Sequence, residues 1–175
     1  MTRVRLDPDA DFQQVFQTIA RRSWRWECQG HYASDEQELN DWLTGRTHED
    51  DGSDRAWYDY IRGLRQRGIP FERVRMLTEP LTDYLRWMLT NTHLNVEAGE
   101  DIRWLSQTKA RDFGMPNYDF YLFDDNRVLI LNFDEQKVLT GEELIDDPDT
   151  VERHRRWRDL VWHHAVRHED YRPAR

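Results

Sequence analysis

Apolar side chains recur every three or four positions in five stretches of the chain, which is the spacing of one face of an α-helix. The clearest stretch follows Pro80, a residue favoured in a first helical turn, and consists of Leu81, Tyr84, Leu85, Met88 and Leu89. A turn is expected after it, at residues 95–99. The same spacing predicts helices within residues 11–19, 34–44, 57–67 and 147–165. Ser34 and Gln37 fit a capping box for one of these helices, and Gly68 fits the residue that ends another.

Six shorter stretches have the pattern of β-strands. Trp24, Trp26 and Cys28 alternate with polar residues, so they share one face of a strand. Residues 128–131 are all apolar, which is typical of a strand covered on both faces. The strands are expected at residues 23–28, 69–77, 101–105, 118–123, 127–133 and 138–143. Asp124, Asp125 and Asn126 are typical of a tight hairpin turn, with their carboxylates facing water.

The order of these elements predicts an α/β (α+β) fold in a single domain of 175 residues. We expect a mixed β-sheet of about five to six strands, covered by helices and followed by a long C-terminal helix. Residues 1–67 form an N-terminal portion with a helix, a strand and further helices, and residues 68–168 form a second α/β portion. No repeat or low-complexity linker separates them.

Composition narrows the class of protein. The chain has 8 Trp, 7 Tyr and 7 Phe, more aromatic side chains than a disordered segment carries. No apolar run approaches the roughly 20 residues that a membrane-spanning helix needs, and residues 1–8 lack the apolar segment of a secretory signal. A single cysteine, Cys28, forms neither an internal disulfide nor a cysteine-based zinc site. The sequence therefore predicts a cytoplasmic protein with no membrane association.

The formal net charge of −9 is unevenly distributed. Residues 35–59 hold nine acidic side chains against two arginines, a balance of −7, and residues 119–147 have the same balance. Residues 61–76 reverse the sign to +4. The acidic total disfavours nucleic acid as a partner, although the basic stretch leaves local phosphate contacts open. The alternation in sign favours a specific contact with another protein or with a second copy of the chain.

One candidate binding site lies where an expected strand meets the following helix. Arg75 is near the end of the strand, and Glu79 precedes the helix, a place where open α/β sheets often bind ligands. An arginine there can clamp a phosphate or carboxylate group. The candidate ligand-binding residues are Arg75, Glu79, Tyr84, Arg86 and Arg103, and the alternative is a simple ion pair between Glu79 and Arg75 or Arg103.

A second candidate is a group of carboxylates near strand ends. Glu100, Asp101, Asp119 and Asp124 supply the oxygen ligands that Mg²⁺ prefers, which would suit a metal-dependent phosphodiesterase or nuclease. Such an enzyme requires at least two of them to converge on one metal position. His164 and His168 lack the intervening glutamate of a zinc protease helix, and no phosphate-binding glycine loop or nucleophile elbow is present. We therefore expect no catalytic residue, cofactor or metal.

Four segments resemble a known family: residues 73–86, 99–105, 119–125 and 154–159. They are similar to an actinobacterial domain-of-unknown-function family, found mostly in Streptomyces and its relatives, whose genes often neighbour small helix-turn-helix regulators. Trp24-Arg25-Trp26-Glu27 also fits its N-terminal part. Residues 69–162 are more distantly similar to one half of a phospholipase D-like domain. Its HxKxxxxD motif is absent, and Asp119 to Leu122 stand near that place, so the resemblance implies a catalytically silent version.

Together these observations predict a non-enzymatic regulatory or interaction domain. It would bind a protein partner, such as a helix-turn-helix regulator, or a small anionic ligand near Arg75 and Arg103, or it would form a homodimer. The alternative is the metal-dependent phosphodiesterase or nuclease described above.

Overall fold

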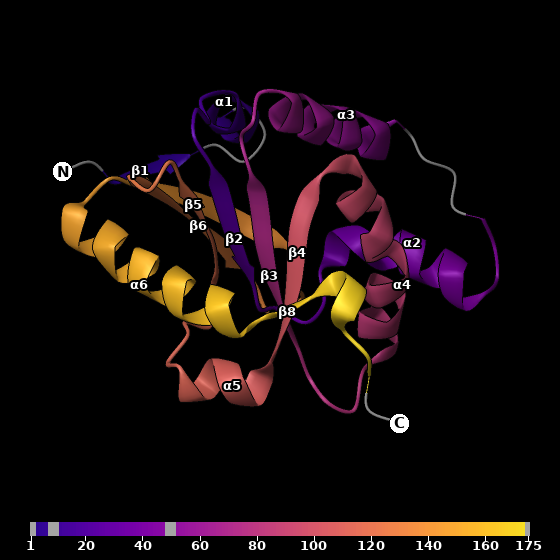
Figure 1. The fold of residues 1–175 in the computed structure, drawn as a ribbon. Coiled ribbons are helices and arrows are strands. Elements are labelled where there is room, and N and C mark those ends of the chain that lie inside the picture. The colour runs from indigo at the N-terminus through magenta and orange to yellow at the C-terminus, as the bar shows by residue number, and fades with distance from the viewer. Residues whose placement is uncertain (1–2, 7–10, 48–51, 174–175) are drawn as a thin grey trace.

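The described residues form one mixed sheet of eight strands, in the order β1-β7-β6-β5-β2-β3-β4-β8 (Figure 1). The computed structural model describes residues 3–6, 11–47 and 52–173. Strands β2, β3 and β4 are parallel, and every other neighbouring pair is antiparallel. The strands are β1 (Arg3–Leu6), β2 (Ser23–Glu27), β3 (Phe71–Leu77), β4 (Glu100–Ser106), β5 (Asp119–Phe123), β6 (Arg127–Phe133), β7 (Leu139–Ile145) and β8 (Val166–Arg167).

In the part of the chain that the structure describes, six α-helices cover the two faces of this sheet. They are α1 (Asp11–Gln17), α2 (Glu36–Leu43), α3 (Ser53–Gln66), α4 (Asp83–Ala98), α5 (Gln107–Asp112) and α6 (Pro148–His164). Side chains of α1, α3 and α4 pack on one face, and side chains of α5 and α6 pack on the other. In Figure 1, α6 lies apart from α3 and α4. Within the described residues, no helix has the length and apolar character that crossing a membrane requires.

The predicted fold class is confirmed: this is a single α+β domain with a mixed sheet and a long C-terminal helix. The sheet has eight strands instead of five or six, because the edge strands β1 and β8 are too short to show a hydrophobic pattern in the sequence. Strand β2 lies between β3 and β5, so the N-terminal portion of the chain contributes a middle strand to the sheet formed by the rest.

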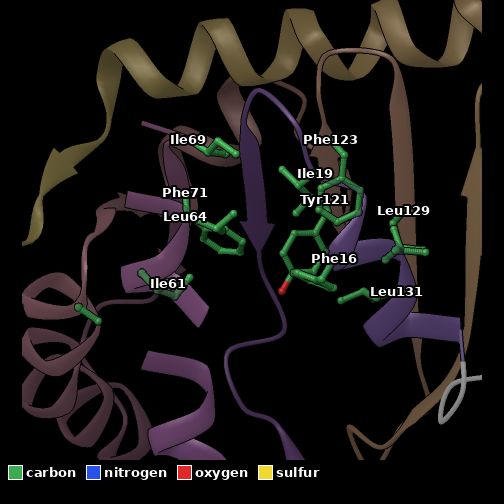
Figure 2. Packing of buried hydrophobic residues seen from close by; sticks show 12 residues of the cluster. Phe16, Ile19, Ile61, Leu64, Ile69, Phe71, Tyr121, Phe123, Leu129 and Leu131 are labelled. Atoms are coloured by element: carbon green, nitrogen blue, oxygen red, sulfur yellow. The ribbon is translucent and has the colours of Figure 1, made fainter. Parts of the chain in front are cut away.

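Aromatic side chains dominate the core beneath α1 and α3. Phe16 packs edge-on against Tyr121 and Phe123, with ring centroids 5.1 and 5.4 Å away, and Figure 2 shows these rings gathered between helix and sheet. On the opposite face, Trp24 and Trp26 are fully buried and pack in one cluster with Cys28, which confirms the prediction that these side chains share a face. Burial of such large apolar surfaces is the main stabilising contribution to the fold.

The predictions at helix ends had mixed outcomes. Gly68, with φ +72°, ends α3, and the backbone N–H of Ile69 donates to the carbonyl oxygen of Leu64, as in a Schellman motif. Pro80 lies before α4, which begins after its N-cap Thr82 and continues to Ala98, through the residues expected to form a turn. The capping box was wrong, because the Ser34 hydroxyl donates to Asp35 and residues 33–35 form a 3₁₀ turn ahead of α2.

Candidate functional site

Charged side chains line the centre of the sheet on the face covered by α2, α3 and α4. In the register of β2 and β3, Arg25 is opposite Arg73 and Glu27 is opposite Arg75. Side chains alternate along a strand, so these four project from the same face as Glu100 of β4. We call Arg25, Glu27, Arg73, Arg75 and Glu100 the charged floor.

Glu27 is the centre of the charged floor. Its carboxylate accepts a hydrogen bond from Nη1 of Arg73 at 2.7 Å and from Nε of Arg75 at 2.5 Å, and it lies 3.0 Å from Nη1 of Arg25. Burial opposes ionisation of this group, but the three guanidinium groups outweigh burial and hold the pKa of Glu27 well below its usual 4.5. Glu27 is therefore an ionised structural partner of three arginines.

Arg73 is held between two carboxylates. Its Nε and Nη2 lie 3.0 and 2.8 Å from Oε2 of Glu100, whose side chain is fully buried. The other oxygen of Glu100 accepts from the indole of Trp57 at 2.8 Å and from the amide of Asn95 at 2.9 Å. Every oxygen of Glu100 is thus occupied, which satisfies the requirement that a buried charge be paired and hydrogen-bonded.

Asp119 lies beside the charged floor, at the start of β5. It is fully buried and accepts from the backbone N–H of Cys28 at 2.9 Å, from the amide of Gln29 at 3.2 Å and from the Tyr32 hydroxyl at 2.5 Å. Arg25 is 3.6 Å away. Burial raises the pKa of Asp119 above its usual 3.8, against the opposing effects of Arg25 and Tyr32.

A pocket of about 410 Å³ opens above the charged floor, within the size range of small-ligand sites. Arg25, Glu27, Arg73 and Arg75 lie at its bottom. The walls come from α3, α4, β5 and the β6–β7 hairpin and are largely aromatic and apolar: Trp57, Tyr58, Trp87, Met88, Leu94, Tyr121, Leu131, Phe133 and Leu139. Asp35, Glu38 and Asp54 add carboxylates from the segment around α2 and from α3.

Arg75 keeps hydrogen-bonding capacity that the protein does not use. Its Nε donates to Glu27, and its Nη1 donates to the Thr92 hydroxyl at 2.6 Å. Among the described residues, no hydrogen-bond acceptor is found for Nη2. The Nε of Arg25 is buried and likewise lacks an acceptor there. An arginine that lines a pocket and keeps an unused N–H donor, as Arg75 does, is suited to a carboxylate or phosphate group.

The structure does not bring the five predicted binding residues together. Arg75 lies in the pocket, and Tyr84 is buried nearby, where its hydroxyl donates to Asp35 at 2.6 Å. Glu79 and Arg86 are exposed, and Arg86 pairs with Asp83. Arg103 points to the opposite face of the sheet from Arg75, since its strand neighbour there is Val74.

Arg103 has a local role on that opposite face. It pairs with Asp101 at 3.1 Å, and its guanidinium lies 3.6 Å from the ring centroid of Trp162 on α6. The alternative prediction for Arg103 was an ion pair with Glu79. In the structure Arg103 does form an ion pair, but its partner is Asp101.

The four carboxylates of the alternative enzyme hypothesis have separate surroundings. Glu100 and Asp119 are held as described above, and Asp101 pairs with Arg103 on the other face. The described residues contain no group of three or more His, Cys, Asp or Glu side chains placed to hold a metal ion.

Asp124, the fourth of these carboxylates, is buried, in contrast to the expectation that it faces water. Its oxygens accept from the backbone N–H groups of Ala20, Arg21 and Arg22 at 3.2, 2.7 and 3.1 Å. Although burial opposes this, these donors lower the pKa of Asp124. The turn itself is confirmed, since Asp124 and Asp125 have φ values of 53° and 61°, as in the favoured hairpin turns.

Arg25, Glu27 and Arg73 were not singled out from the sequence as site residues. The signal that was available is the presence of charged residues at alternating positions within two strands whose other positions are aromatic or apolar. Charged side chains on a strand that is covered on both faces must be paired in the interior.

The fold and this pocket define an α+β domain with an arginine-lined pocket on one face of its sheet. Residues 10–173 match the family described as "Domain of unknown function (DUF6879)", and the chain belongs to that family. No curated protein matches the chain in sequence. The crystal structure of phosphatidylserine synthase from Haemophilus influenzae Rd KW20 is similar with a TM-score of 0.48 and 12% identity, over 95% of this chain and 39% of the synthase chain.

Proposed function

We propose that this is a non-enzymatic binding domain whose pocket takes a small organic anion, held at the bottom by Arg75. The observation that carries the proposal is Arg75, a residue only 7% exposed, which lines the pocket of about 410 Å³ and whose Nη2 has no hydrogen-bond acceptor among the described residues. The ligand class is a carboxylate or phosphate attached to an apolar body, because the walls above the arginine are aromatic and apolar.

The charged floor supports binding more than proton transfer. Glu27 is fixed by three arginines, and its lowered pKa makes it a poor proton acceptor near neutral pH. The same contacts fix Arg75 in one orientation before a ligand arrives. A preorganised guanidinium loses little conformational freedom on binding, which favours affinity.

The test is calorimetric titration with 3-phenylpropionate, a carboxylate with an aromatic body, and with 3-phenyl-1-propanol, its uncharged counterpart. We expect the carboxylate to bind at least tenfold more tightly than the alcohol, the effect of about one charged hydrogen bond. Equal affinities for the two compounds would refute anion binding.

A matched pair of variants locates the site. Arg75→Lys keeps a cation beside Glu27 but removes the planar fork, so the affinity for 3-phenylpropionate should fall at least tenfold. Arg103→Lys makes the same chemical change on the opposite face of the sheet and should leave the affinity unchanged. An Arg75→Lys variant with normal circular dichroism and wild-type affinity would show that the ligand binds elsewhere.

We further propose a cytoplasmic regulatory role through a protein contact, either with a helix-turn-helix regulator or with a second copy of the chain. Exposed apolar side chains support a contact surface at the end of α2, where Trp42 and Leu43 are 37% and 53% exposed. Sedimentation at low and high salt tests the second copy: a dimer that dissociates at high salt is expected from the sign-alternating charge. A monomer under both conditions would contradict it.

A further inference from the structure

With Asp119 ionised, the buried charges around the pocket cancel one another. The charged floor holds three guanidinium groups and two carboxylates, and Asp119 beside it supplies a third carboxylate. Among the described residues that line the pocket, the three arginines of the floor are the cations, and Asp35, Glu38 and Asp54 add further negative charge. An anion that enters the pocket therefore brings a negative charge that no cation of the lining remains to balance, which is costly at a site with little water.

Asp119 is the carboxylate that accepts a proton most readily. The two carboxylates of the charged floor bind guanidinium groups directly. The guanidinium beside Asp119 is that of Arg25, whose Nη2 is 3.6 Å away, beyond hydrogen-bond distance. The donors that Asp119 does have are neutral groups: the backbone N–H and the thiol of Cys28, the amide of Gln29 and the hydroxyl of Tyr32. Burial raises the pKa of Asp119, in agreement with this weak compensation of its charge.

Arg25 and Tyr32 connect Asp119 to the pocket, since both of them line it. The Nη1 of Arg25 lies 3.0 Å from Glu27, and its buried Nε has no acceptor among the described residues. Arg75 binds the same Glu27 at 2.5 Å, so a carboxylate held by Arg75 lies beside Arg25 as well. A proton on Asp119 removes the charge that competes with this carboxylate for Arg25.

The surroundings of Asp119 contain few groups that change charge near neutral pH. The titratable and charged groups on β2, on the segment that follows it and on the β6–β7 turn are Arg25, Glu27, Cys28, His31, Tyr32 and Lys137. The pKa of Glu27 is held well below 4.5, and burial raises the pKa of Cys28 and of Tyr32 above their usual 9.0 and 10.0. Histidine side chains commonly change charge between about pH 5 and 8, so His31 is the group that a test must separate from Asp119.

We propose that Asp119 takes up a proton when the pocket binds its ligand, and that the ligand is accordingly a carboxylate with a single negative charge. The proton comes from the buffer acid and adds to a carboxylate oxygen of Asp119. One added proton compensates one negative charge, so it balances a carboxylate and not a doubly charged phosphate. This inference rests on the proposed function, because it uses the same anion contact at Arg75. It adds the charge of the ligand and a role for Asp119 in setting that charge.

Calorimetric titration of the full chain with 3-phenylpropionate, between about pH 6 and 8.5, tests the proton uptake. Each titration is run in two cationic buffers of different ionisation enthalpy, because a proton taken from the buffer makes the measured enthalpy depend on the buffer. The ligand stays ionised throughout, since a carboxyl group has a pKa of about 4.3. We expect a maximal uptake of at least about half a proton and an affinity about tenfold lower at the alkaline end, as for a rise of one unit in the pKa of Asp119 on binding.

Two other outcomes of this titration have separate meanings. Binding with constant affinity and no proton uptake overturns the role of Asp119 and leaves anion binding intact. Absence of binding at every pH refutes the proposed function itself.

A pair of variants assigns the proton to one side chain. Asp119→Asn keeps the size of the side chain and removes the proton-binding group, so we expect no uptake, an affinity independent of pH and, at about pH 8.5, binding about tenfold tighter than that of the wild type. Damage to the fold would weaken binding instead, and circular dichroism checks the fold. His31→Gln is the matched control and should keep the uptake and the pH dependence of the wild type. A folded Asp119→Asn variant with the pH dependence of the wild type overturns the assignment, and so does a His31→Gln variant that loses it.

The charge of the ligand is tested with 2-phenylethyl phosphate, which carries two negative charges above its second pKa of about 6. At about pH 7.5 we expect it to bind at least tenfold more weakly than 3-phenylpropionate, because its second charge stays uncompensated. A phosphate that binds as tightly as the carboxylate overturns the selection for a single charge and leaves the anion contact at Arg75 intact.

Discussion

The substitution Glu27→Gln tests the electrostatics of the charged floor most directly. It keeps the size of the side chain and removes one negative charge that Arg25, Arg73 and Arg75 share at 3.0, 2.7 and 2.5 Å. The side chains of Glu27 and Arg73 are 7% and 6% exposed, so solvent compensates little for the loss. In the variant, Glu100 and the neighbouring Asp119 are the acidic side chains that remain beside the three buried arginines.

The expected cost is large. Removing one partner of a buried ion pair costs about 3–5 kcal/mol. In a domain of this size each kcal/mol changes the melting temperature by roughly 2–4 °C, so the variant should melt about 10 °C below the wild type. Urea unfolding followed by tryptophan fluorescence measures the free energy, and circular dichroism measures the melting temperature. Glu36→Gln, exposed on α2, should stay within about 0.5 kcal/mol of the wild type.

The pH dependence supplies a second measurement. Because the folded-state pKa of Glu27 is lowered, its contribution is fully present above 4.5, the usual value, and is lost as the pH falls below it. The gap in stability between wild type and Glu27→Gln should therefore be widest at neutral pH and narrow in acid. A gap below about 1 kcal/mol at neutral pH, or one that widens in acid, would refute the assignment of Glu27 as the shared ionised partner.

Three further predictions concern other parts of the fold. Burial raises the pKa of Asp119. The wild type should therefore lose stability relative to Asp119→Asn as the pH rises from 3.8 through the raised pKa, which is the opposite trend to that of Glu27. Urea unfolding in acid and at neutral pH measures this difference in stability. Phe16→Ala should cost about 3–5 kcal/mol in urea unfolding, and Leu43→Ala, at 53% exposure, less than about 0.5. Asp124→Ala should cost about 2–3 kcal/mol, because it leaves backbone N–H donors without an acceptor. Asp124→Asn should cost less, because asparagine tolerates the positive φ and keeps a side-chain oxygen. Equal costs would contradict the role of Asp124 as an acceptor for these backbone donors.

Local patterns carried most of the fold prediction. The helical stripe of α4 and the alternation of Trp24 and Trp26 in β2 depend on side-chain spacing alone, which a sequence displays. The short edge strands β1 and β8 have too few residues to show a period. Their pairing depends on neighbours that only the folded sheet provides.

The site was harder to predict because it depends on the order of the strands. The spacing indicates that Arg73 and Arg75 share a face of their strand. It does not indicate which face of the sheet Arg103 occupies. It does not say that β2 lies between β3 and β5, which is what brings Glu27 to both arginines. For the same reason Arg75 was predicted as a binding residue while its partners were missed, and Arg103 was grouped with a side chain on the opposite face.

The position of β2 in the sheet has a consequence for biosynthesis. Its parallel neighbour β3 begins at Phe71, and its antiparallel neighbour β5 begins only at Asp119. At ribosomal elongation rates, the interval between completion of β2 and synthesis of β5 is about 5–20 s. During that interval the indole rings of Trp24 and Trp26 lack β5, and they also lack α6, whose Val151 and Val161 belong to the same buried cluster. Until synthesis has passed α6, the nascent chain therefore exposes aromatic surface that the finished fold buries.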